Sequence, residues 1–524
     1  MVAGLSVVVP DLYGTGDSEG DFVDADWSVW RTDMQRLIKW IRGQGANSIS
    51  FLGIRAGCLL AADVAMTLDQ PPDKIVCWQP VSDGKQAITQ FLRLKVAAEM
   101  MNGGQVTVGD LRALVEKRKK LEVAGYEISH SLIHEIDQLT LEGLMNHTQN
   151  LFWLEVVANK NKPLPLGSRK KVDALVANGQ PIKSSTVAGD AFWSTQEITH
   201  VPELITVTTN ILSEIEGSSS TAISVKQNSL IDNVNGNERV VQFSCQGSNL
   251  VGVLHQPESV IRRGIVLVVG GPQYRIGSHR QFVRLSRALA TQGYAVFRFD
   301  YRGMGDSEGE LKGFEYIADD INSAINAFCH ELPVIEKVVI CGLCDAASAA
   351  AFYAPQDLRV EGLVLINPWV RSEQGAAKAY LKHYYWERIF SAGFWEKVWK
   401  GKFDYMGSAK SFWNMILQAG ASKRNRSKDI RKAGPDLLVS SASLSDRMFR
   451  SLNAFSGQTL FVLSGNDLTA AEFKETVSAS KAFSRLLRKN RFRTEHLDEA
   501  DHTFSKQEWR NKVIDHTLSW LSSW

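Results

Sequence analysis

An internal repeat constrains the fold of this chain more than any other feature of its 524 residues. Asp-Leu-Tyr-Gly-Thr-Gly-Asp-Ser-Glu-Gly at 11–20 recurs, 289 positions later, as Asp-Tyr-Arg-Gly-Met-Gly-Asp-Ser-Glu-Gly at 300–309. A second pair, Gly53-Ile-Arg-Ala-Gly57 and Gly342-Leu-Cys-Asp-Ala346, keeps the same offset, and each member follows a short apolar run. Two matches at one spacing indicate that the repeated unit is a whole domain, because solenoid repeats are only about 20 to 45 residues long.

The repeat divides the chain into two domains, residues 1–216 and 237–524, joined by a Ser-, Asn- and Gly-rich linker at 217–236. In the second copy, β-branched runs alternate with helical patterns, which predicts a mostly parallel sheet with helices on both faces. Residues at about 371–456 are rich in aromatics and lack a strand pattern, which predicts a helical cap. The eight predicted strands are Val240–Cys245, Leu250–Leu254, Gly264–Val269, Tyr294–Phe299, Lys337–Cys341, Val360–Ile366, Thr459–Leu463 and Phe492–Leu497.

Composition excludes several classes of protein. Lys+Arg 59 against Asp+Glu 57 leaves a net charge of +2, so no overall field favours nucleic acid or an anionic membrane. We find neither a run of about 18 apolar residues that would predict a membrane span nor the basic leader of a signal peptide. Six cysteines in a chain this long are too sparse for a disulfide scaffold and are typical of a reducing, cytoplasmic compartment.

The segment Gly342-x-Cys344-x-Ala346 lies between a predicted strand and an Ala-rich helix, which is the context of a nucleophile elbow. Small residues flank the central position because the backbone there approaches neighbouring elements closely. By residue type alone, a free cysteine at a helix start is more often a buried core residue. The strand, tight turn and helix together favour a catalytic thiolate at Cys344 instead.

Chain order supplies partners for Cys344, since this architecture places the acid after the seventh strand and the base after the eighth. Asp467 follows the predicted strand that ends at Leu463, and His502 follows the last predicted strand. Taken singly, Asp467 could be a helix N-cap and His502 a solvated loop residue. Taken with the elbow, they predict a Cys344/His502/Asp467 triad. The weaker candidates for the acid and base are Asp498, Asp501 and His496.

An oxyanion hole requires main-chain N–H groups where negative charge develops. Asp345 directly follows the predicted nucleophile and supplies one such group. The other is expected from the loop after the third strand, Gly270-Gly-Pro-Gln-Tyr274, where Pro272 has no N–H to donate. We therefore predict the amides of Gln273 and Asp345 as the oxyanion donors.

Across about 237–524 the chain resembles the α/β-hydrolase superfamily. GGPQYR at 270–275, DYRGMGDSEG at 300–309, GLCDAA at 342–347 and SGNDLTA at 464–470 together resemble the type 1 hydrolases encoded with bacterial exosortase (PEP-CTERM) systems. The resemblance implies two tandem α/β-hydrolase-like domains and the same triad. It also implies a role near exopolysaccharide and protein-sorting pathways, with an unknown natural substrate.

The N-terminal copy lacks the residues for this chemistry, because Arg55 stands at its elbow position and neither an acid nor a histidine follows its last two strands. Residues 1–216 resemble the inactive-looking type 2 companion of the same systems, so the chain is similar to a fusion of both types. Only ten residues precede Asp11, whereas residues 237–299 precede the matching point of the second copy, and we expect the natural protein to start upstream of Met1. The strands expected in the N-terminal copy are Leu5–Val9, Ser48–Leu52, Leu151–Val157 and Pro181–Val187.

Other sites are disfavoured by spacing. Cys341 and Cys344 form a C-x-x-C, but the surrounding pattern is too large for a thioredoxin-like domain, and Cys341 should point into the sheet. A zinc site would need a second such pair. The glycine turns at 14–16 and 303–305 miss the dinucleotide-binding spacing by one residue. We expect neither a metal nor a cofactor.

The sequence therefore predicts a hydrolase that cleaves an ester or thioester through an acyl-enzyme on Cys344. The expected partner is a small-molecule acyl substrate, including a carrier-linked thioester. An acyltransferase with the same site is one alternative, and a non-catalytic binding or assembly module is the other. The acyl group, the acceptor and the oligomeric state stay open.

Overall fold

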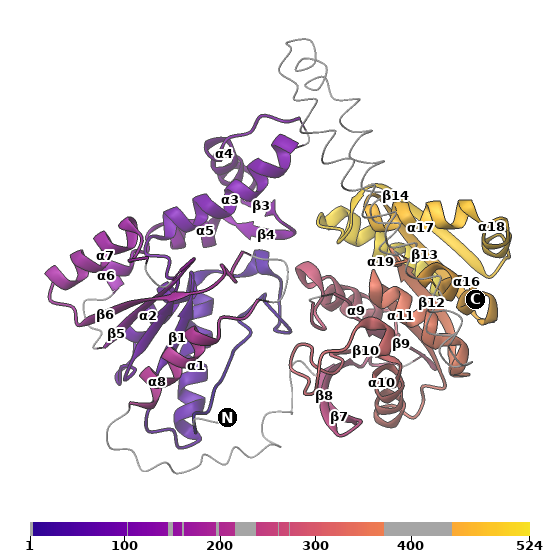
Figure 1. Ribbon diagram of the computed structural model, residues 1–524, viewed down its shortest axis with the longest axis horizontal. Coiled ribbons are helices and arrows are strands. Elements are labelled where there is room, and N and C mark those ends of the chain that lie inside the picture. Colours follow the sequence, from indigo (N-terminus) through magenta and orange to yellow (C-terminus); the bar gives the residue numbers. More distant parts are fainter. Residues whose placement is uncertain are drawn as a thin grey trace, which may run out of the picture. The chain divides into compact units, whose positions relative to one another are not determined.

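The computed structural model describes residues 4–101, 103–144, 150–159, 162–194, 199–214, 237–259, 261–271, 273–370 and 443–524 (Figure 1). The chain divides into two compact units, an N-terminal unit of Met1–Gly236 and a C-terminal unit of Asn237–Trp524. The linker at 217–236 and the predicted cap as far as residue 442 lie outside the described residues. No helix in the described ranges is long and apolar enough to cross a membrane.

The C-terminal unit is built on an eight-stranded sheet in the order β14-β13-β12-β11-β9-β10-β8-β7. β8 pairs antiparallel with β7 and with β10, and the remaining pairs are parallel. The third strand of the unit, β9, lies between the fourth and fifth, and this order confirms the predicted α/β-hydrolase fold. The strands are β7 (Glu238–Cys245), β8 (Ser248–His255), β9 (Arg263–Val268), β10 (Val296–Phe299), β11 (Lys337–Leu343), β12 (Val360–Ile366), β13 (Gln458–Asn466) and β14 (Phe492–Asp501).

Helices cover both faces of this sheet, as Figure 1 shows. Along β9, Ile265 and Leu267 face a core shared with α9 and α19, whereas Val266 and Val268 face a core shared with α10, α11 and α16 to α18. This alternation with a period of two buries both faces of the strand. The helices are α9 (Gln281–Thr291), α10 (Ala318–Glu331), α11 (Asp345–Tyr353), α16 (Leu444–Ala454), α17 (Leu468–Ala479), α18 (Lys481–Leu487) and α19 (Gln507–Leu521), with 3₁₀ turns at η3 (Ser278–Arg280), η4 (Phe314–Tyr316) and η5 (Ala354–Gln356).

The end of the predicted cap has a different role from the one expected. Helix α16 falls inside the predicted range of 371–456, yet its Met448 and Leu452 are fully buried in the same core as α11. Its apolar side chains are spaced by four residues, so they form one stripe that packs against the sheet layer. Residues 444–454 therefore belong to the hydrolase core.

The N-terminal unit has a four-stranded parallel sheet in the order β1-β2-β5-β6, which repeats the order of β11 to β14. Between β2 and β5, at the chain position of the cap, α3 to α6 surround a separate hairpin of β3 and β4. The strands are β1 (Phe51–Ile54), β2 (Ile75–Trp78), β3 (Lys120–Val123), β4 (Tyr126–Ser129), β5 (Leu151–Val157) and β6 (Ile182–Ala188). The helices are η1 (Phe22–Asp24), α1 (Trp27–Gly43), α2 (Gly57–Met66), α3 (Gly84–Met101), α4 (Val108–Arg118), α5 (His130–Asp137), α6 (Leu141–Leu144), α7 (Leu166–Ala177) and α8 (Pro202–Ser213).

The strand predicted at Leu5–Val9 is wrong. These residues belong to no strand and pair with no other described residue in a sheet, and Val7 and Val9 are 76% and 86% exposed. Their repeat counterpart, β10, pairs with β8 and β9, whereas the sheet described in the N-terminal unit consists of β1, β2, β5 and β6. A β-type run stays unpaired where no neighbouring strand can accept its hydrogen bonds.

The strand predicted at Ser48–Leu52 begins later than expected, at Phe51. The Asp73 carboxylate accepts hydrogen bonds from the Ser48 hydroxyl and the Ile49 N–H. At these two positions, bonds to a side chain therefore replace the strand pairing that the sequence predicted. From Phe51 onward the backbone pairs with β2.

Candidate active site

The three predicted triad residues each come directly after a parallel strand. Cys344 follows β11, Asp467 follows β13, and His502 follows β14. Each of these strands runs farther toward its carboxyl end than the sequence pattern predicted. Because parallel strands end at one edge of the sheet, the three side chains gather there.

The backbone at Cys344 has the strained geometry of a tight turn, with φ 62° and ψ −123°. Its N–H donates to the Ile366 carbonyl at 2.9 Å, and its own carbonyl accepts from the Trp369 N–H at 3.1 Å. A Cβ on Gly342 would lie 2.7 Å from the backbone of Ala346, so only glycine fits there. The turn thus holds the half-buried thiol of Cys344 above the end of the sheet.

His502 and Asp467 form a close pair. His502 Nδ1 lies 3.0 Å from Asp467 Oδ1, and the Asp467 side chain is only 5% exposed. The same carboxylate accepts the N–H groups of Thr469 and Ala470 at 3.1 and 3.0 Å, so it also caps α17. Asp467 is therefore a helix N-cap whose carboxylate also faces the histidine, and α17 fixes its orientation.

The electrostatics of His502 favour its charged form. Burial lowers the pKa of its imidazole, but hydrogen bonds and charge interactions with Asp467 and Cys344 outweigh burial and raise this pKa to about 10. An imidazolium at neutral pH would therefore stand beside the sulfur of Cys344.

Asn367 is a supporting residue that the sequence did not reveal. It is fully buried at the end of β12 with φ 44°, and its Nδ2 donates to the His502 carbonyl at 3.1 Å and to Ser464 Oγ at 2.9 Å. Its Oδ1 accepts from the Ser464 N–H at 2.8 Å. One amide thus ties β12 to β13 and to the loop that carries the histidine. A positive φ just after a strand is visible only in the structure.

The loop after β9 lies against the elbow, since the Gly271 N–H donates to Asp345 Oδ2 at 3.1 Å. The Gln273 side chain exchanges two hydrogen bonds with Ser278, and in the described part of the chain the Gln273 main-chain N–H bonds to nothing. The Asp345 N–H likewise bonds to no other described residue. Of the two predicted oxyanion donors, the Gln273 N–H thus has no partner among the described residues, whereas the Asp345 N–H interacts with the carboxylate of its own residue.

The side chain of Asp345 was not anticipated. Its Oδ1 accepts the Ala346 N–H at 2.9 Å, in addition to the Gly271 bond on Oδ2. Burial raises the pKa of this carboxyl, while the N–H groups around it favour the ionised form. A carboxylate thus lies at the first turn of α11, directly beside the nucleophile position.

The weaker acid and base candidates have other surroundings. Asp501 accepts the N–H groups of Thr503 and Ser505 at 3.2 and 2.9 Å, so it closes the turn that carries His502. His496 and Asp498 are exposed on β14. None of the three takes the position that Asp467 and His502 occupy.

The N-terminal unit has the same turn as the one at Cys344, but with an arginine at its central position. Arg55 has φ 55°, its N–H donates to the Trp78 carbonyl at 3.0 Å, and its carbonyl accepts from Val81 at 3.3 Å. Its guanidinium donates to the Gln79 carbonyl at 3.2 Å and lies 5.7 Å from the centre of the Trp193 ring. An arginine cannot act as an acyl-transfer nucleophile.

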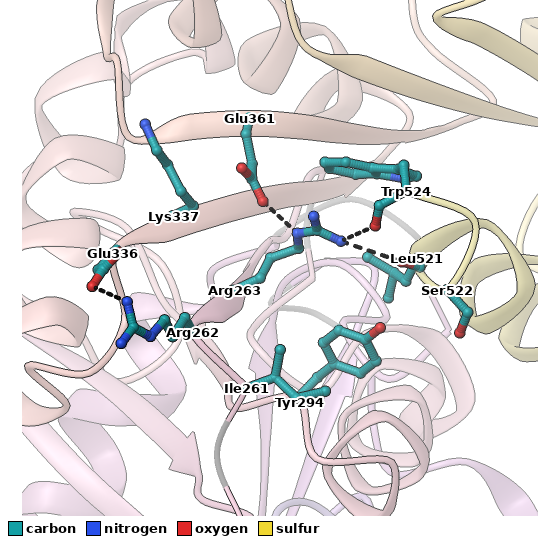
Figure 2. A pocket seen from close by; sticks show the side chains of 10 residues that line it. All are labelled: Ile261, Arg262, Arg263, Tyr294, Glu336, Lys337, Glu361, Leu521, Ser522 and Trp524. Carbon is teal, nitrogen blue, oxygen red and sulfur yellow. Dashed lines mark hydrogen bonds and ion pairs between the residues drawn. The ribbon is translucent and has the colours of Figure 1, made fainter.

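A pocket of about 460 Å³ lies at the opposite edge of the C-terminal sheet, where β9, β11 and β12 begin (Figure 2). Figure 2 shows Arg263 paired with Glu361 and donating to the carbonyls of Leu521 and Trp524. Seven residues of β11 at about 3.3 Å each separate this edge from Cys344. The pocket is therefore not part of the site. No cluster of three metal-ligating side chains occurs within the described ranges.

Residues 262–504 match the family model described as serine aminopeptidase, S33. The match covers most of the C-terminal unit and none of the N-terminal one. Its description names a serine enzyme, whereas this chain has Cys344 at the elbow. No curated protein matches the chain.

Solved structures similar to the chain include an esterase of Pyrococcus furiosus, at 13% identity and a TM-score of 0.37, covering 55% of this chain and 91% of that one. An alpha-beta hydrolase of Vibrio vulnificus is 17% identical, with a TM-score of 0.35 and coverage of 54% and 81%. Similarities at this level carry no argument about substrate. The sheet order, the site geometry and the family match support an α/β-hydrolase enzyme in the C-terminal unit.

Proposed function

We propose that the C-terminal unit cleaves a small acyl thioester or ester, with Cys344 as nucleophile, His502 as acid and base, and Asp467 as the carboxylate that orients the histidine. The observation that carries this proposal is the 3.0 Å contact of His502 with Asp467, at the sheet edge where the strained elbow presents Cys344.

In the acylation step, the Cys344 sulfur attacks the carbonyl carbon and the carbonyl oxygen takes the negative charge. The main-chain N–H groups of Gln273 and Asp345 stabilise this oxyanion. The tetrahedral intermediate then collapses, and the bond to the leaving group breaks as the His502 imidazolium gives that group its proton.

In the second step, His502 takes a proton from water, and the resulting hydroxide attacks the acyl-enzyme. A second tetrahedral intermediate releases the carboxylic acid, and the proton held by His502 completes the return to a thiolate and imidazolium pair. Asp467 keeps Nδ1 of the histidine occupied, so that the other ring nitrogen faces the reacting atoms.

Thioesters are the favoured substrates because attack by a thiolate then exchanges one acyl C–S bond for another. Attack on an oxygen ester would replace a stable acyl C–O bond by a more reactive acyl C–S bond. The motifs shared with exosortase-associated hydrolases suggest a carrier-linked acyl compound of exopolysaccharide or PEP-CTERM sorting pathways. The N-terminal unit, with Arg55 at its elbow, is non-catalytic in this proposal.

The test is labelling by a thioester probe, with the acylated residue located by mass spectrometry. We expect stoichiometric acylation of Cys344 in the full chain and none in Cys344→Ala. His502→Ala should slow acylation roughly 10² to 10⁴-fold. Cys329→Ala is the matched control, since Cys329 and Cys344 are the two cysteines that are not fully buried. Acylation at Cys329 alone would contradict the proposal.

The fate of the acyl group separates the alternatives. Release as the free acid supports a hydrolase, and transfer to an added amine or alcohol supports an acyltransferase with the same site. Tight binding of the thioester without any acylation would instead support a binding module.

A further inference from the structure

The carboxylate of Asp345 lies beside the N–H group that is predicted to stabilise the oxyanion. Asp345 begins α11 one residue after Cys344, and its two oxygens accept the N–H groups of Gly271 and Ala346 at 3.1 and 2.9 Å. Gly271 belongs to the loop that supplies the second oxyanion donor. The side chain thus bridges the two backbone segments that form the predicted oxyanion hole.

Close packing holds the carboxylate there. A Cβ on Gly270 would come within 1.8 Å of Asp345 Oδ1, so the absence of a side chain at Gly270 makes room for this oxygen. The partly buried Asp345 carboxylate is therefore packed between the loop and the start of the helix.

This position conflicts with the chemistry of acyl transfer. The N–H group of Asp345 should stabilise an oxyanion, yet the same residue carries a carboxylate a few ångströms away. Like charges at such a distance repel strongly in a partly buried site, where water screens them poorly. The carboxylate also uses the dipole at the start of α11, which would otherwise favour the developing negative charge.

We propose that Asp345 is a built-in restraint on acyl transfer: its carboxylate occupies N–H groups at the elbow and repels the oxyanion, so that acylation of Cys344 requires this carboxylate to move away or lose its charge. The inference rests on the proposed function and deepens it, because it concerns the rate at which the same site accepts an acyl group. Alkylation of the thiol builds no oxyanion and escapes the restraint.

A structural role for Asp345 predicts the opposite result. If the carboxylate served only to fasten the loop through Gly271, its removal would misplace the Gln273 donor and slow acylation. Asp345→Asn separates the two roles, since the amide oxygen can still accept the Gly271 N–H while the charge is gone. Asp345→Ala removes both the charge and the fastening.

The experiment measures two rates on the full chain, acylation of Cys344 by a neutral thioester and alkylation of the same residue by iodoacetamide. The ratio of the two rates reports the oxyanion hole separately from the reactivity of the thiolate. We expect Asp345→Asn to raise this ratio at least about tenfold at neutral pH. Asp498→Asn, which removes an exposed acid on β14, is the matched control and should leave the ratio unchanged.

An unchanged or lower ratio in Asp345→Asn overturns the inference, whether or not Asp345→Ala also slows acylation. A thiol that is alkylated but acylated in neither the wild type nor the variants contradicts the proposed function itself, as does a Cys344 that reacts with neither reagent in a folded chain. The two failures are thus distinguishable.

Discussion

Arg55 and Cys344 hold the same place in the two units, 289 positions apart in the sequence. Both have a positive φ, 55° and 62°, and both donate their N–H to the last residue of the neighbouring strand, Trp78 or Ile366. Only the side chain differs in kind. The comparison teaches that the elbow is specified by its backbone bonds and by small neighbours such as Gly342, and that it persists without a nucleophile.

The support beneath the elbow is also shared. Gln79 and Asn367 follow β2 and β12 with φ 45° and 44°, and each donates its N–H to the adjacent strand. The Gln79 side chain accepts the Val156 N–H at 2.9 Å, just as Asn367 accepts that of Ser464 at 2.8 Å. Only Asn367 goes on to hold a histidine loop.

The two units also differ in how far the strand that leads into the elbow, β11 or β1, is buried. Cys341 and Leu343 on β11 are 1% and 4% exposed, in the core formed with α9 and α19. Their repeat counterparts on β1, Leu52 and Ile54, are 44% and 43% exposed. The same strand position is thus a core position in one unit and a surface position in the other.

The largest difference should be in acyl transfer. We expect Cys344→Ala to lower thioester cleavage by roughly 10³-fold or more, because no other group in the site can form the acyl-enzyme. Arg55→Ala should leave cleavage unchanged, and Arg55→Cys should add none, since that elbow has no histidine or acid partner. Cleavage assays on the full chain measure both, and activity gained by Arg55→Cys would break the comparison.

A large difference is also expected in stability. Leu343→Ala should lower the free energy of unfolding of the C-terminal unit by about 2–5 kcal/mol, because it leaves a cavity in a closed core. Ile54→Ala should cost the N-terminal unit less than about 1 kcal/mol, since the side chain is already half exposed. Hydrogen exchange in denaturant, followed peptide by peptide, assigns each loss to its unit. Equal losses would show that β1 is covered in solution.

A smaller difference is expected when the side-chain amide below each elbow, that of Asn367 or of Gln79, is removed. Asn367→Ala leaves the buried Ser464 N–H without its acceptor, so we expect a loss of about 1–3 kcal/mol and slower acylation of Cys344. Gln79→Ala should cost about 1 kcal/mol, because Gln79 is less buried, and it should not change acylation. The same exchange experiment and the thioester probe give the two readouts. Unaltered acylation in Asn367→Ala would remove its role in holding the histidine loop.

The smallest effect concerns the pH dependence of the site in the C-terminal unit, for which the N-terminal unit has no counterpart. The pKa of His502 is raised to about 10, so the imidazolium needed by the leaving group persists from neutral pH up to that value and is lost above it. Thioester cleavage should therefore fall about tenfold for each pH unit above about 10. Alkylation of Cys344, which needs no proton donor, should not fall. A decline centred near pH 6.5 would mean that the ordinary histidine pKa applies.

Much of the C-terminal unit could be predicted because its signals are local. All eight strands of its sheet were expected, and β12 has the predicted bounds of Val360–Ile366. The turn at Gly342 and the chain order of Cys344, Asp467 and His502 can be recognised from short stretches of sequence. The structure brings those three side chains to one edge of the sheet, and their catalytic roles remain a proposal.

The N-terminal unit shows where local signals fail. Leu5–Val9 has the composition of a strand and forms none, because a strand exists only with a partner to bond. The repeat correctly pointed to related sheets in the two units, but it could not show which strands would find neighbours.

The sequence by itself therefore determined the duplicated architecture, the strands of the C-terminal sheet and the empty elbow of the N-terminal unit, since periodicity, turn chemistry and motif order act over a few residues. Only the tertiary structure decided that Asn367 supports the loop of His502, that α16 belongs to the core, and that the Asp345 carboxylate lies against Gly271. These features depend on groups that are distant in the chain, and a side chain's hydrogen-bond partner is settled only when folding brings such groups together.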